Sequence, residues 1–315
     1  METKTNIISK SPIKKKKLTY GYNNRAGYLF IMPWLLGFLS FTIIPMLTSL
    51  YYSFTKFDMV SSPKIIGFKN YIDIFTIDPK FRQALKITFI YALTSVPLRL
   101  AFALLVALLL VQKRKLVGFY RAVFYIPSVI GGSVAVSVMW LQLFGVNGVL
   151  NSFLISLGII EAGQGIGWTG DPRSALASLV VLAAWQFGSP MLIFLAGLKQ
   201  IPTSYYEAAS IDGAGKWRQF TAITLPILTP IIFFNFIMQM VSGFMMFTQA
   251  FIITNGGPFD STLVYALYMF QKAFTYFNMG YASALAWVLL IIISSITAII
   301  FKSSSYWVFY EAKGE

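Results

Sequence analysis

The 315-residue chain carries far too little charge for a soluble protein of its size. It is 57% hydrophobic and only 11% charged, and its mean hydropathy is +0.69. Soluble domains have about 25% charged residues, so the composition indicates a polytopic membrane protein. The absence of Cys and His excludes disulfides, thiol nucleophiles, imidazole bases and the usual zinc or haem sites. The net charge of +14 gathers in short loops and a tail, where topology and lipid headgroups explain it better than nucleic acid does.

Six apolar stretches are long enough to cross a bilayer, which takes about 20 helical residues. They lie at 28–54, 85–111, 122–144, 174–198, 226–254 and 281–301. The first is longer than the apolar run of a signal peptide and no small-x-small cleavage site follows it, so we expect an uncleaved helix. Prolines lie in or at the ends of the first five stretches, which favours bent helices packed in a bundle. The predicted fold class is all-α, a polytopic membrane protein with six transmembrane helices.

The distribution of Lys and Arg predicts the orientation of these helices. Sixteen of them lie on one side, in the N-terminal tail, the second-to-third and fourth-to-fifth connections and the C-terminus, against eight on the other. The positive-inside rule then places both termini in the cytoplasm. We therefore expect a basic cytoplasmic tail at 1–25, a transmembrane domain at 26–302 and a cytoplasmic tail at 303–315.

A polar segment, EAASIDGAGKWRQF at 207–220, interrupts the apolar sequence within a predicted cytoplasmic loop at 199–225. Ser204 and Glu207 fit a capping box at the start of a short helix. Asp212 and Gly213 then favour a turn, before a second short helix leads to the fifth span. The residues alone predict helix, turn and helix. They leave open whether the segment is only an amphipathic connector at the membrane surface.

The same segment resembles the EAA motif of permease subunits in binding-protein-dependent ABC importers. That motif is Glu-Ala-Ala, three residues, Gly, and then about nine residues to Ile-x-Leu-Pro. The matching positions are Glu207, Ala208, Ala209, Asp212, Gly213, Ala214, Phe220, Ile223, Leu225 and Pro226. GFKNYIDIF at 67–75, FYRAVFYIPSVIGG at 119–132 and TNGGPFDST at 254–262 are similar to segments of sugar-type permeases, the last to the larger maltose-type half.

The resemblance implies a type I ABC importer permease in the bacterial cytoplasmic membrane that translocates an oligosaccharide or related sugar. It implies that the loop docks into a cytoplasmic ABC ATPase dimer through the residues Glu207, Ala208, Ala209, Asp212 and Gly213. It also implies a second permease, forming a heterodimer, and an extracytoplasmic sugar-binding protein. Because the chain has no Walker A pattern, we expect no catalytic residue, metal or cofactor in it, with ATP and Mg²⁺ on the partner ATPase.

Polar residues within the spans mark a candidate substrate path. In the fifth span, one helical face carries residues spaced 4, 3, 4 and 3 apart: Asn235, Gln239, Ser242, Met246 and Gln249. Their amides and hydroxyls suit neutral, hydroxyl-rich solutes, and Phe236, Phe244 and Phe247 are placed to stack on sugar rings. The alternative is that the stripe only supplies interhelical hydrogen bonds, worth about 0.6 kcal/mol each.

Arg99 is a second polar residue at membrane depth, where a charge costs a few kcal/mol. We expect it to pair with a polar group inside the bundle; the alternative is contact with an acidic substrate such as a uronate. Gln186 is a further candidate for the same cavity, whereas Trp185 fits core packing better.

Two other classes of protein remain open at this point. A stand-alone secondary transporter or channel would not need the EAA-like loop, and it usually carries intramembrane acids for ion coupling. A membrane-embedded enzyme would place His, Asp or Cys at membrane depth. All eleven acids lie outside the apolar stretches, which disfavours both.

Overall fold

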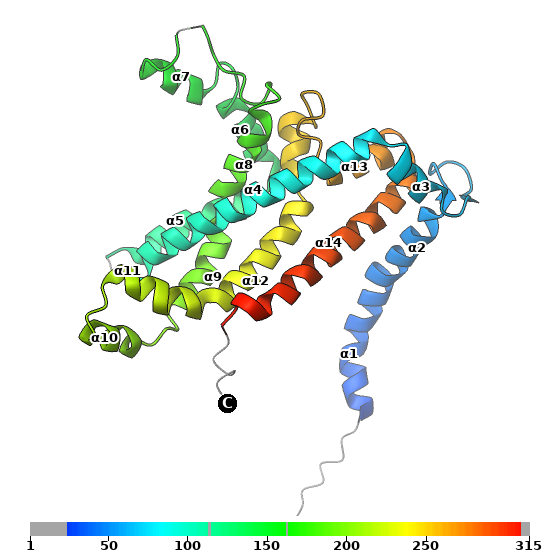
Figure 1. Ribbon diagram of the computed structural model, residues 1–315. Helices are drawn as coiled ribbons and strands as arrows, with labels where there is room; N and C mark the ends of the chain where they lie inside the picture. Colours follow the sequence, from blue (N-terminus) through cyan, green and yellow to red (C-terminus); the bar gives the residue numbers. More distant parts are fainter. Residues whose placement is uncertain (1–23, 113–114, 162, 310–315) are drawn as a thin grey trace, which may run out of the picture. The chain divides into compact units, whose positions relative to one another are not determined.

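The structure, a computed structural model, describes residues 24–112, 115–161 and 163–309 (Figure 1). The chain forms two compact units, Met1–Thr48 and Ser49–Glu315. Most of the predicted basic tail and the last residues of the predicted C-terminal tail lie outside the described residues. The candidate sites all lie in the second unit.

Four helical segments are long and apolar enough to cross a membrane: Gly27–Ser53, Pro79–Leu110, Lys216–Phe244 and Met279–Trp307. Two bent pairs pass the same test together: Val117–Ile130 with Val134–Leu143, and Ala175–Trp185 with Gly188–Leu198. Counting each pair as one span gives six in the described part of the chain, in agreement with the prediction.

The first span runs through α1 (Asn24–Phe38), the π-helical segment η1 (Leu39–Ile43) and α2 (Ile44–Ser53). A small antiparallel sheet of β1 (Thr55–Lys56) and β2 (Lys64–Ile65) follows, with Thr55 opposite Ile65, and then α3 (Lys69–Thr76). The buried Asn70 side chain of α3 donates to the Ser53 and Thr55 carbonyls at 2.8 and 2.9 Å. These bonds fasten α3 to the end of α2.

The helix α4 (Pro79–Leu110) is central to the second unit. It packs against α8 (Ala175–Trp185), α9 (Gly188–Leu198) and α12 (Leu225–Phe244). Four alanines of α4 are fully buried: Ala84, Ala92, Ala103 and Ala107. Small side chains allow membrane helices to approach closely, so these positions explain how three helices can contact one.

The third predicted span, 122–144, is bent as its proline led us to expect, but the bend is so sharp that the span is broken into two helices. The helices α5 (Val117–Ile130) and α6 (Val134–Leu143) meet at an angle of 98°. Pro127 lies within α5 and deprives that helix of one hydrogen bond. Ser133 then starts α6, because its hydroxyl accepts from the Val136 amide at 3.3 Å. The chain continues through α7 (Val149–Ser156).

The fifth span also differs from the predicted 226–254. It begins in α11 (Lys216–Gln219), passes through the π-helical segment η2 (Phe220–Thr224) and ends with α12 at Phe244. The chain then leaves the helix before η3 (Ala250–Thr254). A buried helix that we did not predict, α13 (Tyr265–Phe270) with η4 (Gln271–Thr275), precedes the last span, α14 (Met279–Trp307).

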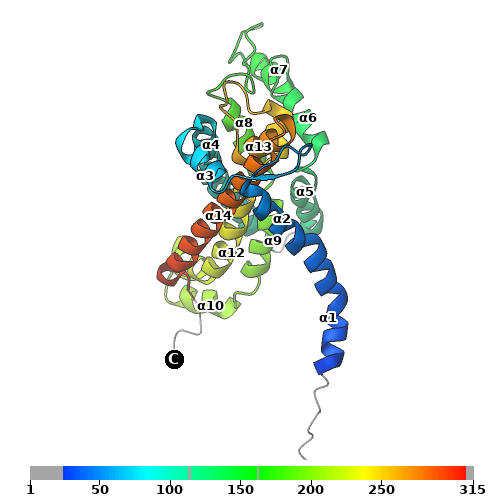
Figure 2. The ribbon, with the colours of Figure 1, turned by 90° about the vertical axis from the view of Figure 1, so that its right-hand side faces the viewer.

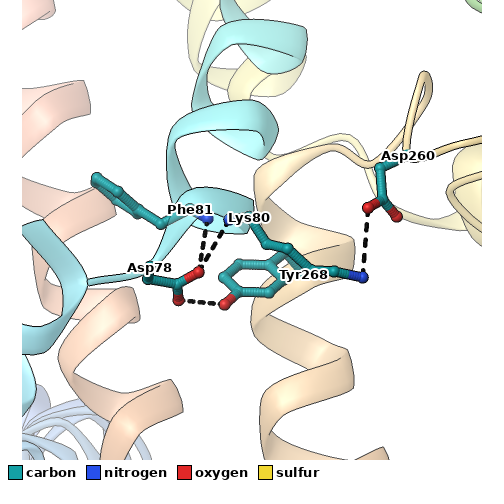
Figure 3. Close-up of polar contacts among 5 residues, drawn as sticks. All are labelled: Asp78, Lys80, Phe81, Asp260 and Tyr268. Atoms are coloured by element: carbon teal, nitrogen blue, oxygen red, sulfur yellow. Dashed lines mark hydrogen bonds and ion pairs between the residues drawn. The ribbon is translucent and has the colours of Figure 1, made fainter. Parts of the chain in front are cut away.

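Asp78 joins three helices at the start of α4, and Figure 3 shows its bonds to Lys80, Phe81 and Tyr268. Its carboxylate caps α4 by accepting from the Lys80 and Phe81 amides at 3.0 and 3.1 Å, and it also accepts from the hydroxyls of Tyr268 on α13 and Tyr281 on α14. Partial burial raises the pKa of Asp78, but hydrogen bonds from Tyr268, Tyr281 and the Phe81 amide, together with the charge of Lys272, lower it below its usual value. The carboxylate therefore stabilises this helix junction in its ionised form.

A short helix lies at each end of the second unit. α7 lies at one end and α10 (Thr203–Ile211) at the other, as both views show (Figures 1 and 2). The candidate sites lie at the α10 end and within the bundle.

Candidate functional site

A polar cavity of about 200 Å³ lies inside the bundle. It is lined by Tyr91, Ser95, Val96, Arg99, Gly132, Gln186, Gln239, Ser242, Gly243, Met245, Met246, Phe247, Thr248 and Gln249. α4 and α12 supply half of the lining residues, and the breaks in the third, fourth and fifth spans supply the other half. Non-helical backbone at membrane depth is tolerated where it lines a polar cavity, which accounts for three breaks meeting here.

Arg99 is held by two hydrogen bonds at the cavity wall. Its Nη1 donates to Oε1 of Gln239 on α12 at 2.6 Å, and its Nε donates to the Ala183 carbonyl of α8 at 2.7 Å. The predicted pairing with a polar group inside the bundle is confirmed. None of the cavity-lining residues is acidic, so the guanidinium has no carboxylate partner in this wall.

Gln186 and Gln249 meet at the break between α5 and α6. Their Nε2 atoms donate to the Gly131 carbonyl at 2.9 and 3.5 Å. A Cβ at Gly131 would lie 2.5 Å from Cγ of Gln186 and 2.5 Å from the Pro127 carbonyl oxygen. Only glycine fits there, which lets the glutamine side chain approach the backbone of the break.

The structure brings five of the six predicted path residues together, namely Arg99, Gln186, Gln239, Ser242 and Gln249. Asn235 is not among the lining residues. It is fully buried, and its amide nitrogen and oxygen have no hydrogen-bond partner among the described residues. The predicted helical stripe therefore holds only in part.

Only one of the three phenylalanines that we expected to stack on sugar rings lines the cavity. Phe247 lines the cavity, whereas Phe244 is buried and packs edge-on against Phe89 with ring centroids 5.0 Å apart. Phe236 is only packed against the core. Trp185 is 36% exposed, and its ring centroid lies 5.9 Å from that of Trp140. The prediction that it is a core residue was therefore wrong.

We did not predict several residues at the cavity. Ser95 and Tyr91 lie one and two turns before Arg99 on α4, and the helical spacing from Arg99 could have found them. Gly131 and Gly132 were visible as a glycine pair after a proline. What they contact could not be read from the sequence, because Gln186 is more than fifty positions away.

The predicted helix, turn and helix at 199–225 is confirmed as α10, a turn at Asp212–Gly215 and α11. The predicted capping box was wrong. Pro202 is the N-cap, and α10 begins at Thr203 without a side-chain cap. Because the backbone of Pro202 is extended at ψ 135°, the helix starts directly after it, and Ser204 falls in the first turn.

Gly213 ends α10 in a left-handed conformation, with φ +77°. Its amide donates to the Ser210 carbonyl at 3.1 Å, and the Ala214 amide donates to the Ala209 carbonyl at 2.8 Å. This pair of bonds is a Schellman motif, which favours glycine at the left-handed position. The EAA-like glycine thus has a defined backbone role.

The helix α10 is fastened to the start of the fifth span. Nε2 of the buried Gln219 donates to the Ser210 hydroxyl at 2.9 Å and to the Ala214 carbonyl at 3.0 Å. The Tyr206 and Thr224 hydroxyls are 2.8 Å apart and share a hydrogen bond. These bonds fasten α10 to α11 and η2, which lead directly into α12.

The other side of this segment is exposed. Glu207, Ala208 and Asp212 are exposed, and Ala209 is half-buried. Two large apolar side chains nearby are unusually exposed for such a short segment, Ile211 at 88% and Trp217 at 77%. Exposed large apolar side chains mark a surface that contacts another protein or the membrane.

These features define a membrane transport subunit: a bundle of apolar helices around a polar cavity, with a rigid polar helix exposed at one end. Residues 78–305 match the family described as "Binding-protein-dependent transport system inner membrane component". The chain belongs to this family, and it is a permease component of an ABC importer. The family match disfavours a stand-alone transporter or channel.

Two relatives and one solved structure show how far the similarity extends. The chain is 56% identical to "Probable ABC transporter permease protein YesP" of Bacillus subtilis (strain 168), over 96% of this chain and 97% of that one. It is 32% identical to "Lactose transport system permease protein LacF" of Rhizobium radiobacter, over 90% and 95%. The crystal structure of a bacterial alginate ABC transporter has the same fold, with a TM-score of 0.76 at 19% identity over 89% of this chain and 94% of that one.

Proposed function

We propose that this chain translocates an oligosaccharide or related sugar across the bacterial cytoplasmic membrane, driven by ATP hydrolysis on a separate ATPase. The observation that carries the proposal is the polar cavity within an apolar bundle. Its wall offers three amides, on Gln186, Gln239 and Gln249, and one cation, Arg99. Such groups exchange hydrogen bonds with sugar hydroxyls in either direction.

The names of relatives support the sugar class. The family member LacF is named for lactose, and another, 31% identical to this chain over 289 residues, is the "Arabinooligosaccharides transport system permease protein AraP" of Bacillus subtilis (strain 168). Phe247 adds an apolar ring to the cavity wall, and a ring face can stack on a pyranose. The remaining donors of Arg99 also accommodate a carboxylate-bearing sugar.

A second permease subunit is part of the proposal. At about 200 Å³, the cavity is smaller than the roughly 300–1,000 Å³ of ordinary ligand pockets. One chain therefore provides one wall and a local binding surface rather than a complete path for an oligosaccharide. A second permease, pairing as a heterodimer, would supply the opposite wall.

The ATPase would dock on α10 and the turn after it. Glu207 offers a carboxylate to a basic group, Ala208 and Ala209 allow close approach, and Asp212 and Gly213 shape the turn. The fastening of α10 to Thr224 and Gln219 would carry the motion of the ATPase into α12. ATP and Mg²⁺ would bind the ATPase dimer and not this chain.

The orientation follows from the charge distribution. Residues 1–25, the 199–225 loop and residues 303–315 would face the cytoplasm, and residues 26–302 would form the transmembrane domain. An extracytoplasmic sugar-binding protein would deliver the substrate at the α7 end.

Uptake of labelled oligosaccharides tests the proposal. A strain that lacks this chain should lose uptake of one oligosaccharide class, and the wild-type chain should restore it. Gln239→Leu should restore little uptake, although the protein reaches the membrane and holds the ATPase. The matched control is Gln200→Leu, an exposed amide outside the cavity, which should restore it fully.

Two results would contradict the proposal. Normal uptake with Gln239→Leu would indicate that the polar stripe only supplies hydrogen bonds between helices. Uptake that survives ATP depletion but stops when the ion gradient collapses would indicate a secondary transporter.

A further inference from the structure

A second, larger cavity of about 990 Å³ lies beside α10, away from the polar cavity within the bundle. Its lining residues come from the end of α4, the start of α5, the end of α9, α10, α11 and η2. Figure 1 shows α10 and α11 at the lower left. Thr203 and Tyr206 of α10 and Lys216 of α11 belong to the wall of the cavity. Neither the polar path nor the exposed α10 surface uses this cavity.

The charged residues that line this cavity are all basic. Lys115, Arg121, Lys199 and Lys216 line it, and no Asp or Glu does. Nε of Arg121 is buried and has no hydrogen-bond partner among the described residues. A buried cationic donor without an acceptor is unfavourable, so the wall is suited to an anion that accepts from Arg121.

The rest of the wall is apolar. It comprises Leu108, Val111, Val117, Leu198, Ile201 and Phe220. These residues belong to or adjoin the ends of membrane helices, where the hydrocarbon region gives way to the headgroups. The cavity thus joins a cationic part to an apolar part at the depth of the lipid headgroups.

We propose that this cavity binds an anionic membrane phospholipid, with its phosphate among Arg121, Lys115 and Lys199 and the upper part of an acyl chain against the apolar wall. Basic pockets between membrane helices on the cytoplasmic side suit anionic headgroups in this way. The placement in the cytoplasmic leaflet rests on the orientation under Proposed function. The bound lipid would bridge α4 and α5 to α11 through Lys216.

Lipid titration followed by native mass spectrometry tests the site. The full chain in neutral detergent is titrated with phosphatidylglycerol and with phosphatidylcholine of the same acyl chains. Phosphatidylglycerol should bind more tightly. Arg121→Gln and Lys199→Gln should each weaken its binding about fivefold, while Lys302→Gln, an exposed lysine outside the cavity, should not. Lys199 is exposed, so its variant tests the site even if Arg121→Gln fails to fold.

Four results would overturn the proposal. One is equal binding of the two lipids, and another is equal loss of binding with Lys302→Gln. The third is displacement of phosphatidylglycerol by millimolar inorganic phosphate, which would indicate a small-anion site. The fourth is its displacement by the purified ATPase, which would make the cavity part of a protein interface. If the wild-type chain does not prefer phosphatidylglycerol but still holds the ATPase, only the lipid site is rejected. If it prefers phosphatidylglycerol but does not hold the ATPase, only the coupling role is rejected.

Discussion

Arg99 and Gln239 are joined by a hydrogen bond of 2.6 Å across 140 positions of sequence, and the bond links α4 to α12 at the wall of the polar cavity. Charge-assisted hydrogen bonds contribute about 1.5–3 kcal/mol each, and removing one partner leaves the other unsatisfied at membrane depth. The pair thus serves two purposes, because it holds the bundle together and positions polar groups toward the cavity.

A double-mutant cycle over this pair measures the first purpose. We expect Arg99→Leu and Gln239→Leu each to destabilise the chain, and the double variant to be more stable than the sum predicts by about 1.5–3 kcal/mol. Thermal unfolding of the four proteins in one detergent gives the coupling. Additive effects would show that the two side chains act independently.

The glycine pair at the break of the third span gives a second prediction. Gly131→Ala places a Cβ 2.5 Å from both Cγ of Gln186 and the Pro127 carbonyl oxygen, so Gln186 must leave the cavity wall or the break must move. We expect strongly reduced uptake and a lower melting temperature. Gly132→Ala is the matched control, because a Cβ at Gly132 meets nothing within 4 Å. Similar losses in both variants would argue against this account of the break.

The turn after α10 allows a comparison of the same kind. Gly213 has φ +77°, where an L-residue costs about 1–2 kcal/mol, so Gly213→Ala should weaken ATPase attachment in a pull-down. Gly213→Pro should be more severe, because it fixes φ near −65° and removes the amide that bonds Ser210. Gly215→Ala should have little effect, since Gly215 has φ −68° and open space around it. Equal attachment in all three variants would mean that the turn geometry is not required.

The lowered pKa of Asp78, the residue that caps the start of α4, predicts that the stability of the fold depends on pH. This pKa is lowered from 3.8 in the folded chain, so the ionised form of Asp78 adds stability above pH 3.8 that is lost as the pH falls through the folded value. Asp78→Asn should therefore melt several degrees below the wild type at neutral pH, and the gap should close only in the acid range below pH 3.8. The control is Asp260→Asn, which breaks the 3.3 Å surface ion pair with Lys80 and should change little. A gap that closes already near pH 6 would indicate another group.

The sequence predicted those features that depend on local spacing. The apolar lengths located the spans, and Gly213 after a short polar helix located the turn, because left-handed backbone at a helix end favours glycine. Arg99 and Gln239 were visible because polar groups are costly in lipid and must face protein or a cavity.

The sequence could not reveal features that depend on contacts between distant segments. The stripe on the fifth span assumed one helix, but α12 ends at Phe244 and the chain is not helical at 245–247, just before Gln249. Asn235 lies on the same helical face and is nevertheless fully buried. The junction of Asp78 with Tyr268 and Tyr281 joins residues about 200 positions apart, and no local pattern signals it.

The central claim is that the α10 segment, which is α10 with the turn at 212–215, binds a separate ATPase through Glu207. The most direct measurement is co-purification of the ATPase with Glu207→Lys, together with its substrate-stimulated ATP hydrolysis. Like charges across a docked contact cost several kcal/mol, so we predict that this variant inserts normally but loses the ATPase or its stimulation by substrate. Glu161→Lys makes the same charge change at an exposed position outside the α10 segment and should keep both. If Glu207→Lys also keeps both, α10 is a surface connector and the coupling role is wrong.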